Sequence, residues 1–200
     1  MPEERKPRKD AVRNRAAVFA AADALFTRCA SPEEVTMADI AAEAGVGKAT
    51  LFRAFGDRTG LIRALYEARL EPLREAIEQG PPPLGPTAAP LERLPALLDA
   101  VLCFKLDNRH LALALEATGA GSSPYGTEHY ERWHTLLRDL LRRIPGLADE
   151  ADFTAHALLA ATRADLVGYL TGERSTPRAS LRAHLAAYTT TLLGGRDHEA

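Results

Sequence analysis

The sequence predicts an all-α protein of about nine helices, arranged as a small N-terminal helical domain and a larger C-terminal one. Composition is the first indication: 37 alanines and 29 leucines stand against 6 valines and 4 isoleucines. Ala and Leu favour helices, whereas β-branched residues favour strands. Apolar residues also recur at helical spacing between breaks rich in glycine and proline, and the chain shows no long alternation of period two.

The N-terminal residues divide into a charged arm and a first helix. Residues 1–10 carry two prolines and mostly charged side chains, which predicts a flexible basic arm. Residues 11–28 place Val18, Leu25 and Phe26 at helical spacing, so we expect the first helix there. The segment that follows, up to residue 35, contains a proline and is expected to be a loop.

Two short helices and a longer one come next. Thr36 is the predicted N-cap of the first short helix, with Asp39 as its acidic partner three residues later. The Gly-Val-Gly sequence at 45–47 ends this helix, and a second short helix is expected over 48–55. After a further glycine break, the pattern predicts a longer helix over 58–79.

The stretch 80–90, GPPPLGPTAAP, is the richest in helix-breaking residues and separates the two halves of the chain. The helices expected beyond it span 94–107, 109–118, 124–144, 150–171 and 177–193. We therefore divide the chain into an arm (1–10), an N-terminal domain (11–57) and a C-terminal domain (58–200).

Charge and composition bound the function. The net charge is -2, which argues against a basic coat over the whole molecule but allows a local basic patch. No apolar run approaches the roughly 20 residues that span a bilayer, and no secretory signal follows Met1. Cys29 and Cys103 are too few for a disulfide framework. We expect a cytoplasmic protein without membrane contact, in which both cysteines are small apolar residues.

The segment Thr36–Phe55 has the dimensions of a helix-turn-helix. Apolar residues on its two helices are placed to pack on the first helix, which leaves small and basic residues on the outer face of the second. Such residues allow close approach to a DNA major groove, where Arg53 is able to read guanine edges and the Thr50 methyl to touch thymine. The helix N-terminus at Lys48 offers free N–H groups to a phosphate, and Arg58 is placed for another phosphate contact. An ordinary helix pair without DNA is the alternative.

The residues themselves favour the first of these readings. The runs AVFAAADALFTR (17–28) and VTMADIAAEAGVGKATLFRAFGDRTGLI (35–62) closely resemble the DNA-binding domain of TetR/AcrR-family transcriptional regulators. The resemblance covers about a third of the chain and departs from the family pattern at Gly47, Phe52 and Ala54, where hydrogen-bonding side chains are usual. It implies a recognition helix and the following DNA-contacting residues: Thr36, Lys48, Ala49, Thr50, Phe52, Arg53 and Arg58.

The resemblance also implies what the C-terminal domain does. In this family the last two helices pair with their copies in a second subunit, for which the candidates are Ala161, Ala164, Gly168, Leu181, Leu185, Tyr188 and Leu192. The alternative is that this stripe faces the chain's own core. The preceding helices are expected to enclose an effector pocket. Its candidate residues are Phe104, His110, Glu116, Tyr130, Trp133, His134, Leu137 and Arg163, with Leu115 and Phe153 as further apolar lining.

We find no catalytic pattern in the sequence. The histidines form no HxxxH or HExxH pair, and no Cys–Cys metal spacing, phosphate loop or nucleophile elbow is present. We therefore predict that the protein is not an enzyme and that it binds no metal ion or cofactor. The resemblance implies a ligand-responsive repressor that binds a palindromic operator in double-stranded DNA as a homodimer and leaves it when a small-molecule effector binds. The alternative is a small all-α enzyme or carrier that has lost DNA binding.

Overall fold

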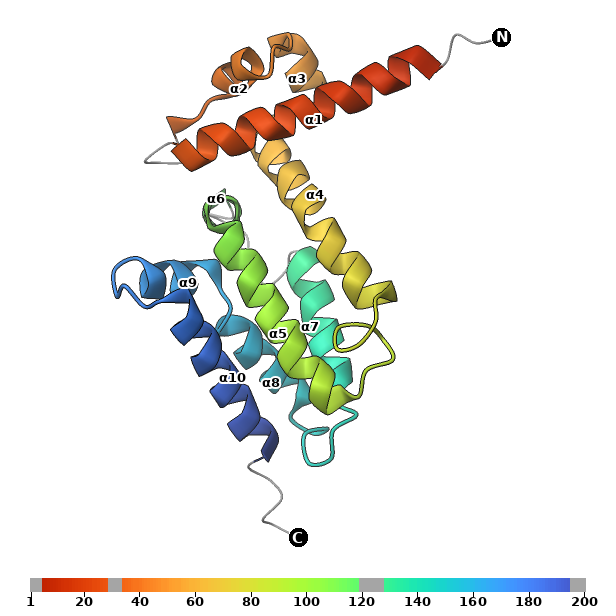
Figure 1. The fold of residues 1–200 in the computed structure, drawn as a ribbon, viewed down its shortest axis with the longest axis vertical. Helices are drawn as coiled ribbons and strands as arrows, with labels where there is room; N and C mark the ends of the chain where they lie inside the picture. Colours follow the sequence, from red (N-terminus) through yellow and green to blue (C-terminus); the bar gives the residue numbers. More distant parts are fainter. Residues whose placement is uncertain (1–4, 29–33, 119–127, 195–200) are drawn as a thin grey trace. The chain divides into compact units, whose positions relative to one another are not determined.

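The structure is a computed structural model that describes residues 5–28, 34–118 and 128–194. It separates into two compact units, Met1–Arg69 and Leu70–Ala200, which are described in turn. Across the described ranges the chain forms ten α-helices and no strand (Figure 1). The all-α class is thereby confirmed, and the boundary between units lies inside the helix predicted over 58–79, some twelve residues beyond the predicted domain boundary.

The N-terminal unit consists of α1 (Arg5–Arg28), α2 (Met37–Glu43), α3 (Lys48–Phe55) and the first part of α4 (Arg58–Gln79). α1 begins at Arg5, so the arm predicted over 1–10 is wrong for residues 5–10, and residues 1–4 lie outside the described part. The helix tolerates Pro7 because this residue falls in the first turn, where the backbone N–H has no intrahelical acceptor.

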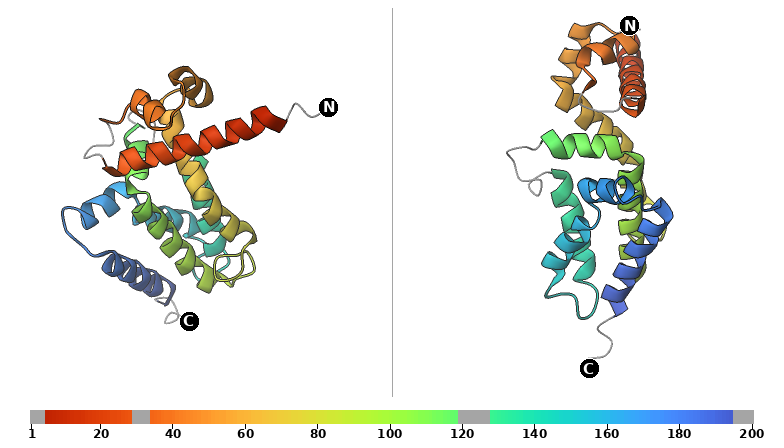
Figure 2. Two further views of the ribbon diagram at one scale, coloured as in Figure 1. Left: turned by 45° about the horizontal axis from the view of Figure 1, so that its top comes forward. Right: turned by 90° about the vertical axis from the view of Figure 1, so that its left-hand side faces the viewer.

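One hydrophobic core holds these helices together. α1 lies across α2 and α3 (Figure 2), and Ile40, Leu51, Leu61 and Ile62 are fully buried between the helices. The other buried apolar residues of this unit are Val18, Ala21, Ala22, Phe26, Val35, Met37, Ala41, Leu65 and Tyr66. An ion pair of 2.5 Å between Arg69 and Asp23 also joins α4 to α1.

Both ends of α2 are fixed by local hydrogen bonds. Thr36 forms the predicted N-cap: its Oγ accepts from the Asp39 N–H (3.2 Å), while the Thr36 N–H donates to the Asp39 carboxylate (3.0 Å). The Thr36 hydroxyl, which donates to the same carboxylate, holds the pKa of Asp39 below its usual value. At the other end, the N–H groups of Gly45 and Val46 donate to two carbonyls of the last turn, which is a Schellman motif.

Substituting Gly45 tests this turn. Its φ is +64° and no atom lies within 4 Å of where a Cβ would be, so Gly45→Ala is strained by its backbone conformation alone. We expect it to lower the free energy of unfolding by about 1–2 kcal/mol in urea denaturation. The matched control is Gly47→Ser two residues later, where φ is -65° and serine can cap α3. Equal stability of the two variants would contradict the role given to Gly45.

The C-terminal unit contains the rest of α4 and six further helices. These are α5 (Pro90–Asp107), α6 (Arg109–Thr118), α7 (Glu128–Leu141), α8 (Ala151–Ala160), α9 (Ala164–Thr171) and α10 (Arg178–Gly194). α5 begins four residues before the predicted start because Pro90 sits at the first helical position, where proline is favoured. α7 pairs with α8, α6 with α9, and α10 with α5 (Figures 1 and 2).

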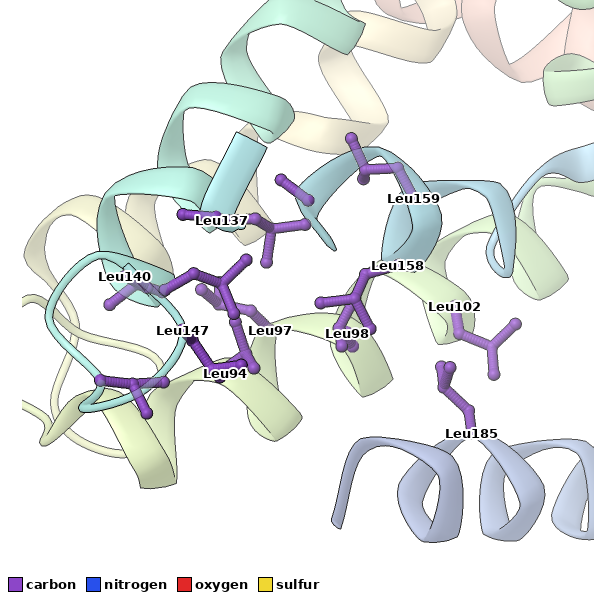
Figure 3. Packing of buried hydrophobic residues seen from close by; sticks show 14 of the residues in the cluster. Leu94, Leu97, Leu98, Leu102, Leu137, Leu140, Leu147, Leu158, Leu159 and Leu185 are labelled. Atoms are coloured by element: carbon purple, nitrogen blue, oxygen red, sulfur yellow. The ribbon is translucent and has the colours of Figure 1, made fainter. Parts of the chain in front are cut away.

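Leucines from four helices form the main core of this unit. Leu94, Leu97 and Leu98 of α5 meet the leucines of α7 and α8 (Figure 3). Leu185 of α10 lies opposite Leu102 of α5 at the edge of the same cluster (Figure 3).

Two charged pairs also attach α10 to α5. Arg182 binds the Asp99 carboxylate through two bonds of 2.7 Å, and Arg178 pairs with Asp107. The Arg178 guanidinium holds the pKa of Asp107 below its usual value. Because the folded pKa is the lower one, this stabilisation is present at neutral pH and is lost as the pH falls through the folded pKa.

The predicted helix over 150–171 is two helices in the structure. The chain leaves the α conformation between α8 and α9, and Arg163 becomes the extended N-cap residue of α9. The guanidinium of Arg163 binds the carboxylate of Asp165, and Thr162 is buried with its hydroxyl donating to the Leu159 carbonyl. No glycine or proline marks this break in the sequence, which is why periodicity predicts a continuous helix.

None of the helices in the described ranges has the length and apolar character needed to cross a lipid bilayer.

Candidate nucleic-acid interface

α3 presents a small, basic and exposed face. Lys48, Ala49, Thr50 and Arg53 are all exposed, as is the ring of Phe52. Neither Lys48 nor Arg53 takes part in an ion pair with another residue of the described ranges. Lys48 and Arg53 can therefore approach the phosphates and base edges of a DNA groove without first breaking an ion pair, and the small side chains beside them allow close contact.

The opposite side of α3 anchors this face. Leu51 is 1% exposed and packs into the core of the N-terminal unit. Phe55 contacts Phe19 of α1, with ring centroids 5.8 Å apart, and the Arg15 guanidinium lies over both rings. At the end of α3, Gly56 adopts φ +77° and Asp57 caps α4 by accepting from the Gly60 N–H at 2.7 Å. These contacts on the inner side of α3 fix the position of its exposed outer face.

Thr36 differs from the other predicted DNA contacts. Thr36 is exposed at the start of α2, but its hydroxyl and its N–H both form hydrogen bonds with the Asp39 carboxylate. The first structural task of Thr36 is therefore to begin α2. A contact to DNA from this residue remains a prediction.

Arg58 is engaged inside the N-terminal unit. Its Nε donates to the Val35 carbonyl at 2.9 Å, and its guanidinium lies over the Phe26 ring, 5.6 Å from the centroid. These contacts tie the start of α4 to the residue that precedes the N-cap of α2. The sequence predicts a phosphate contact for Arg58, whereas these contacts support a positioning role.

Arg58→Ala separates the two roles. Removing the side chain leaves the carbonyl of the buried Val35 without this donor, so we expect a loss of about 1–3 kcal/mol in the free energy of unfolding. DNA affinity should fall together with stability while the salt dependence of the remaining binding stays unchanged. A salt slope reduced by about 0.9 with unaltered stability would instead show that Arg58 contacts a phosphate.

A cavity of about 240 Å³ lies in the C-terminal unit. It is bounded by α4, the segment before α5, α5 itself and α7. Its lining residues are Leu70, Arg74, Ile77, Glu78, Pro86, Arg93, Arg132, Trp133 and Leu136. Trp133 is the single predicted pocket residue among them. The others escape sequence reasoning because their convergence depends on how α4 packs against α7.

The remaining pocket candidates lie elsewhere in the C-terminal unit. Leu137 is buried in the leucine core, and Arg163 pairs with Asp165. Tyr130 and His134 cluster with His156 of α8.

Phe153 is 75% exposed, so it does not line a cavity and its prediction as pocket lining is wrong. Three half-buried residues lie outside the cavity lining: Phe104, His110 and Leu115. Glu116 belongs to α6, and its side chain lies outside the described part, as does all of Cys29.

The stripe predicted for a subunit interface divides into buried and exposed residues. Leu181 and Leu185 pack into the chain's own core, the alternative that the sequence left open. Ala164 and Gly168 are buried as well, Gly168 beside the Arg109 guanidinium. Ala161 and Leu192 are half-buried against the core. Tyr188 is 50% exposed. Two apolar residues of α9, Leu166 and Tyr169, are exposed as well.

Comparison with known proteins places this geometry in a family. The model of the bacterial regulatory proteins of the tetR family matches residues 18–65, which include all of α2 and α3. The HTH-type transcriptional regulator SAB2452 of Staphylococcus aureus (strain bovine RF122 / ET3-1) is 30% identical over 135 residues, which are 68% of this chain and 71% of that protein. The chain belongs to the TetR family.

Other TetR-family relatives match in sequence or in fold. The HTH-type transcriptional repressor LfrR of Mycolicibacterium smegmatis is 39% identical over 72 residues, a match that spans 36% of this chain and 38% of LfrR. A TetR-like regulator from Rhodococcus sp. RHA1 superposes with a TM-score of 0.63 at 24% identity, covering 93% of this chain and 98% of that one. The structure of LfrR in complex with proflavine gives a TM-score of 0.58 at 20% identity, covering 91% and 97%. These two structures show that the TetR fold extends over nearly the whole chain.

Proposed function

We propose that this TetR-family chain is a transcriptional repressor that binds a palindromic DNA operator as a homodimer and is released by a small-molecule effector. The observation that carries the proposal is the exposed face of α3, on which Lys48, Thr50 and Arg53 stand without internal partners in the described ranges while Leu51 anchors the helix. A cytoplasmic location follows from the need to reach chromosomal DNA.

A mobility-shift assay on the DNA flanking the chain's own gene tests this function. We expect retarded complexes at low salt that dissociate steeply as salt rises, because phosphate contacts release condensed counterions. Fragments from the coding sequence serve as the control for non-specific binding. Absence of any complex at low salt, on any genomic fragment, would contradict a DNA-binding role and favour the carrier alternative.

The homodimer is supported by the apolar side chains that the last helices leave exposed. Leu166 and Tyr169 of α9 and Tyr188 of α10 lie at the surface of the C-terminal unit. A second subunit would also supply a second copy of α3, so that each half-site of a palindromic operator is bound by one copy. Sedimentation equilibrium is expected to give a dimer at micromolar concentration, with Tyr188→Glu shifting it towards monomer.

The cavity of the C-terminal unit supports the effector part of the proposal. Four of its lining residues, Leu70, Arg74, Ile77 and Glu78, belong to α4, the same helix whose residues up to Arg69 belong to the N-terminal unit, where Arg69 pairs with Asp23 of α1. A molecule bound there and preferring one conformation of α4 would shift the population of DNA-competent dimers. The cavity is slightly smaller than the range of about 300–1,000 Å³ common for drug-sized ligands, which favours a small effector.

A further inference from the structure

Two neighbouring helices of the C-terminal unit bring together a cluster of imidazoles and a carboxylate. Tyr130 and His134 lie one turn apart on α7, and Asp152 and His156 lie one turn apart on α8. α7 and α8 pack side by side (Figure 2). This pairing joins residues 18 or more positions apart in the sequence, so no short motif reveals it. The cluster has no part in the DNA-binding face or in the lining of the cavity.

The ligand-type atoms of this cluster converge. One ligating atom each from His134, Asp152 and His156 lies within 4.8 Å of the others. His134 Nε2 is 3.4 Å from Asp152 Oδ1, and His156 Nε2 is 4.0 Å from Asp152 Oδ2. A tetrahedral ion with bonds of about 2.0–2.1 Å needs ligand atoms roughly 3.4 Å apart, so one pair already fits. The second pair requires a rotation of the mostly exposed Asp152 carboxylate. His134 Nε2 also lies 3.3 Å from the Asp152 backbone carbonyl oxygen, a contact in which Nε2–H donates, so the ion binds only when His134 gives up this hydrogen bond and carries its proton on Nδ1.

The imidazole rings are held in place by packing and by a hydrogen bond. His134 is only 6% exposed, and its ring stacks on that of His156 with centroids 4.0 Å apart. The Tyr130 hydroxyl lies 2.5 Å from His156 Nδ1. When Nδ1–H donates to the Tyr130 oxygen, the lone pair of His156 is on Nε2, the atom that faces Asp152. An outer hydrogen bond of this kind orients the histidine ligands of many metal sites.

We propose that His134, Asp152 and His156 bind a divalent transition-metal ion of the zinc class, with Tyr130 as a positioning residue. Two imidazoles and one carboxylate are a donor set that Zn²⁺ accepts, with a water molecule in the fourth position. The half-exposed His156 and the exposed Asp152 leave the ion a path from solvent. A bound ion joins α7 to α8. The proposal goes beyond the proposed regulatory function and does not depend on it.

Calorimetric titration of the chelator-treated full chain with Zn²⁺, carried out without a histidine tag and without DNA, tests the site. We expect one Zn²⁺ per chain, a higher melting temperature with the ion, and the visible absorption of four-coordinate Co²⁺ when Co²⁺ replaces Zn²⁺. Asp152→Asn and His156→Gln, both at exposed or half-exposed positions, should each weaken Zn²⁺ binding by more than about 100-fold. Tyr130→Phe should weaken it by about 10–100-fold, the usual effect of losing an outer hydrogen bond.

The matched control is His184→Gln, an exposed histidine on α10, which should leave the affinity unchanged. Circular dichroism of each variant confirms that the helices are retained. The proposal is overturned if Zn²⁺ shows no saturable binding, which would make the cluster a purely structural hydrogen-bond network. It is equally overturned if Asp152→Asn and His156→Gln bind Zn²⁺ as the unmodified chain does, which would place the ion elsewhere.

Discussion

Arg93→Met is expected to lower the free energy of unfolding of the C-terminal unit by about 2–4 kcal/mol. Arg93 is 6% exposed, and its guanidinium donates to the carbonyls of Ile77 (2.7 Å) and Leu84 (2.8 Å). Ile77 lies in the last turn of α4, where carbonyls have no intrahelical donor, so Arg93 closes that helix and holds the following segment. Methionine fills a similar volume but leaves both carbonyls without a partner.

Urea denaturation followed by circular dichroism measures this effect. The matched control is Arg142→Met, an exposed arginine just beyond α7 whose nearest carboxylate oxygen is 3.9 Å away, which should change stability by less than about 0.5 kcal/mol. A loss for Arg93→Met as small as for this control would show that water replaces the guanidinium at both carbonyls. Burial also lowers the pKa of Arg93, as expected for a cation that is removed from solvent.

Lys48→Ala and Arg53→Ala are expected to weaken DNA binding in different ways. Lys48, at the N-terminus of α3, faces the phosphate backbone in our account, so its loss should weaken binding to all sequences and reduce the salt slope by about 0.9. Arg53, one and a half turns later, is placed to read a base edge. Its loss should cost about 1–3 kcal/mol at particular base pairs and relax the preference there.

Fluorescence anisotropy on matched and singly substituted operators, each at several salt concentrations, distinguishes these effects. Arg63→Ala is the control, because Arg63 is an exposed cation on α4 rather than on α3. If all three variants behaved alike, binding would reflect general positive charge instead of a recognition helix.

Much of the N-terminal unit could be predicted from the sequence because its signals are local. The bounds of α3 (48–55) and of α4 (58–79) agree with prediction, since glycines and a capping aspartate mark their ends. The Thr36 cap also follows from residues three apart. Arg58 shows where local reasoning stops: a basic residue beside a recognition helix suggests a phosphate contact, whereas its partner Val35 is 23 residues away.

The C-terminal unit was harder to predict because its sites depend on long-range packing. Aromatic and polar residues such as Phe153 look like pocket lining in the sequence, but only the packed helices show that this ring points to solvent. Nothing in the sequence distinguishes Arg93 from a surface arginine, because the carbonyl that it binds belongs to Ile77 in the last turn of α4, 16 residues away. His134 and His156 are 22 residues apart, and their stacking needs α7 and α8 to pair.

Selection of bound sequences from a random double-stranded DNA library tests the central claim most directly. The account predicts that the full chain enriches an inverted repeat whose half-sites lie in major grooves about one helical turn, or 34–36 Å, apart. It further predicts that a chain carrying both Lys48→Ala and Arg53→Ala enriches no such repeat. Enrichment of no sequence by the unmodified chain, or of the same repeat by the doubly substituted chain, would contradict DNA recognition through α3.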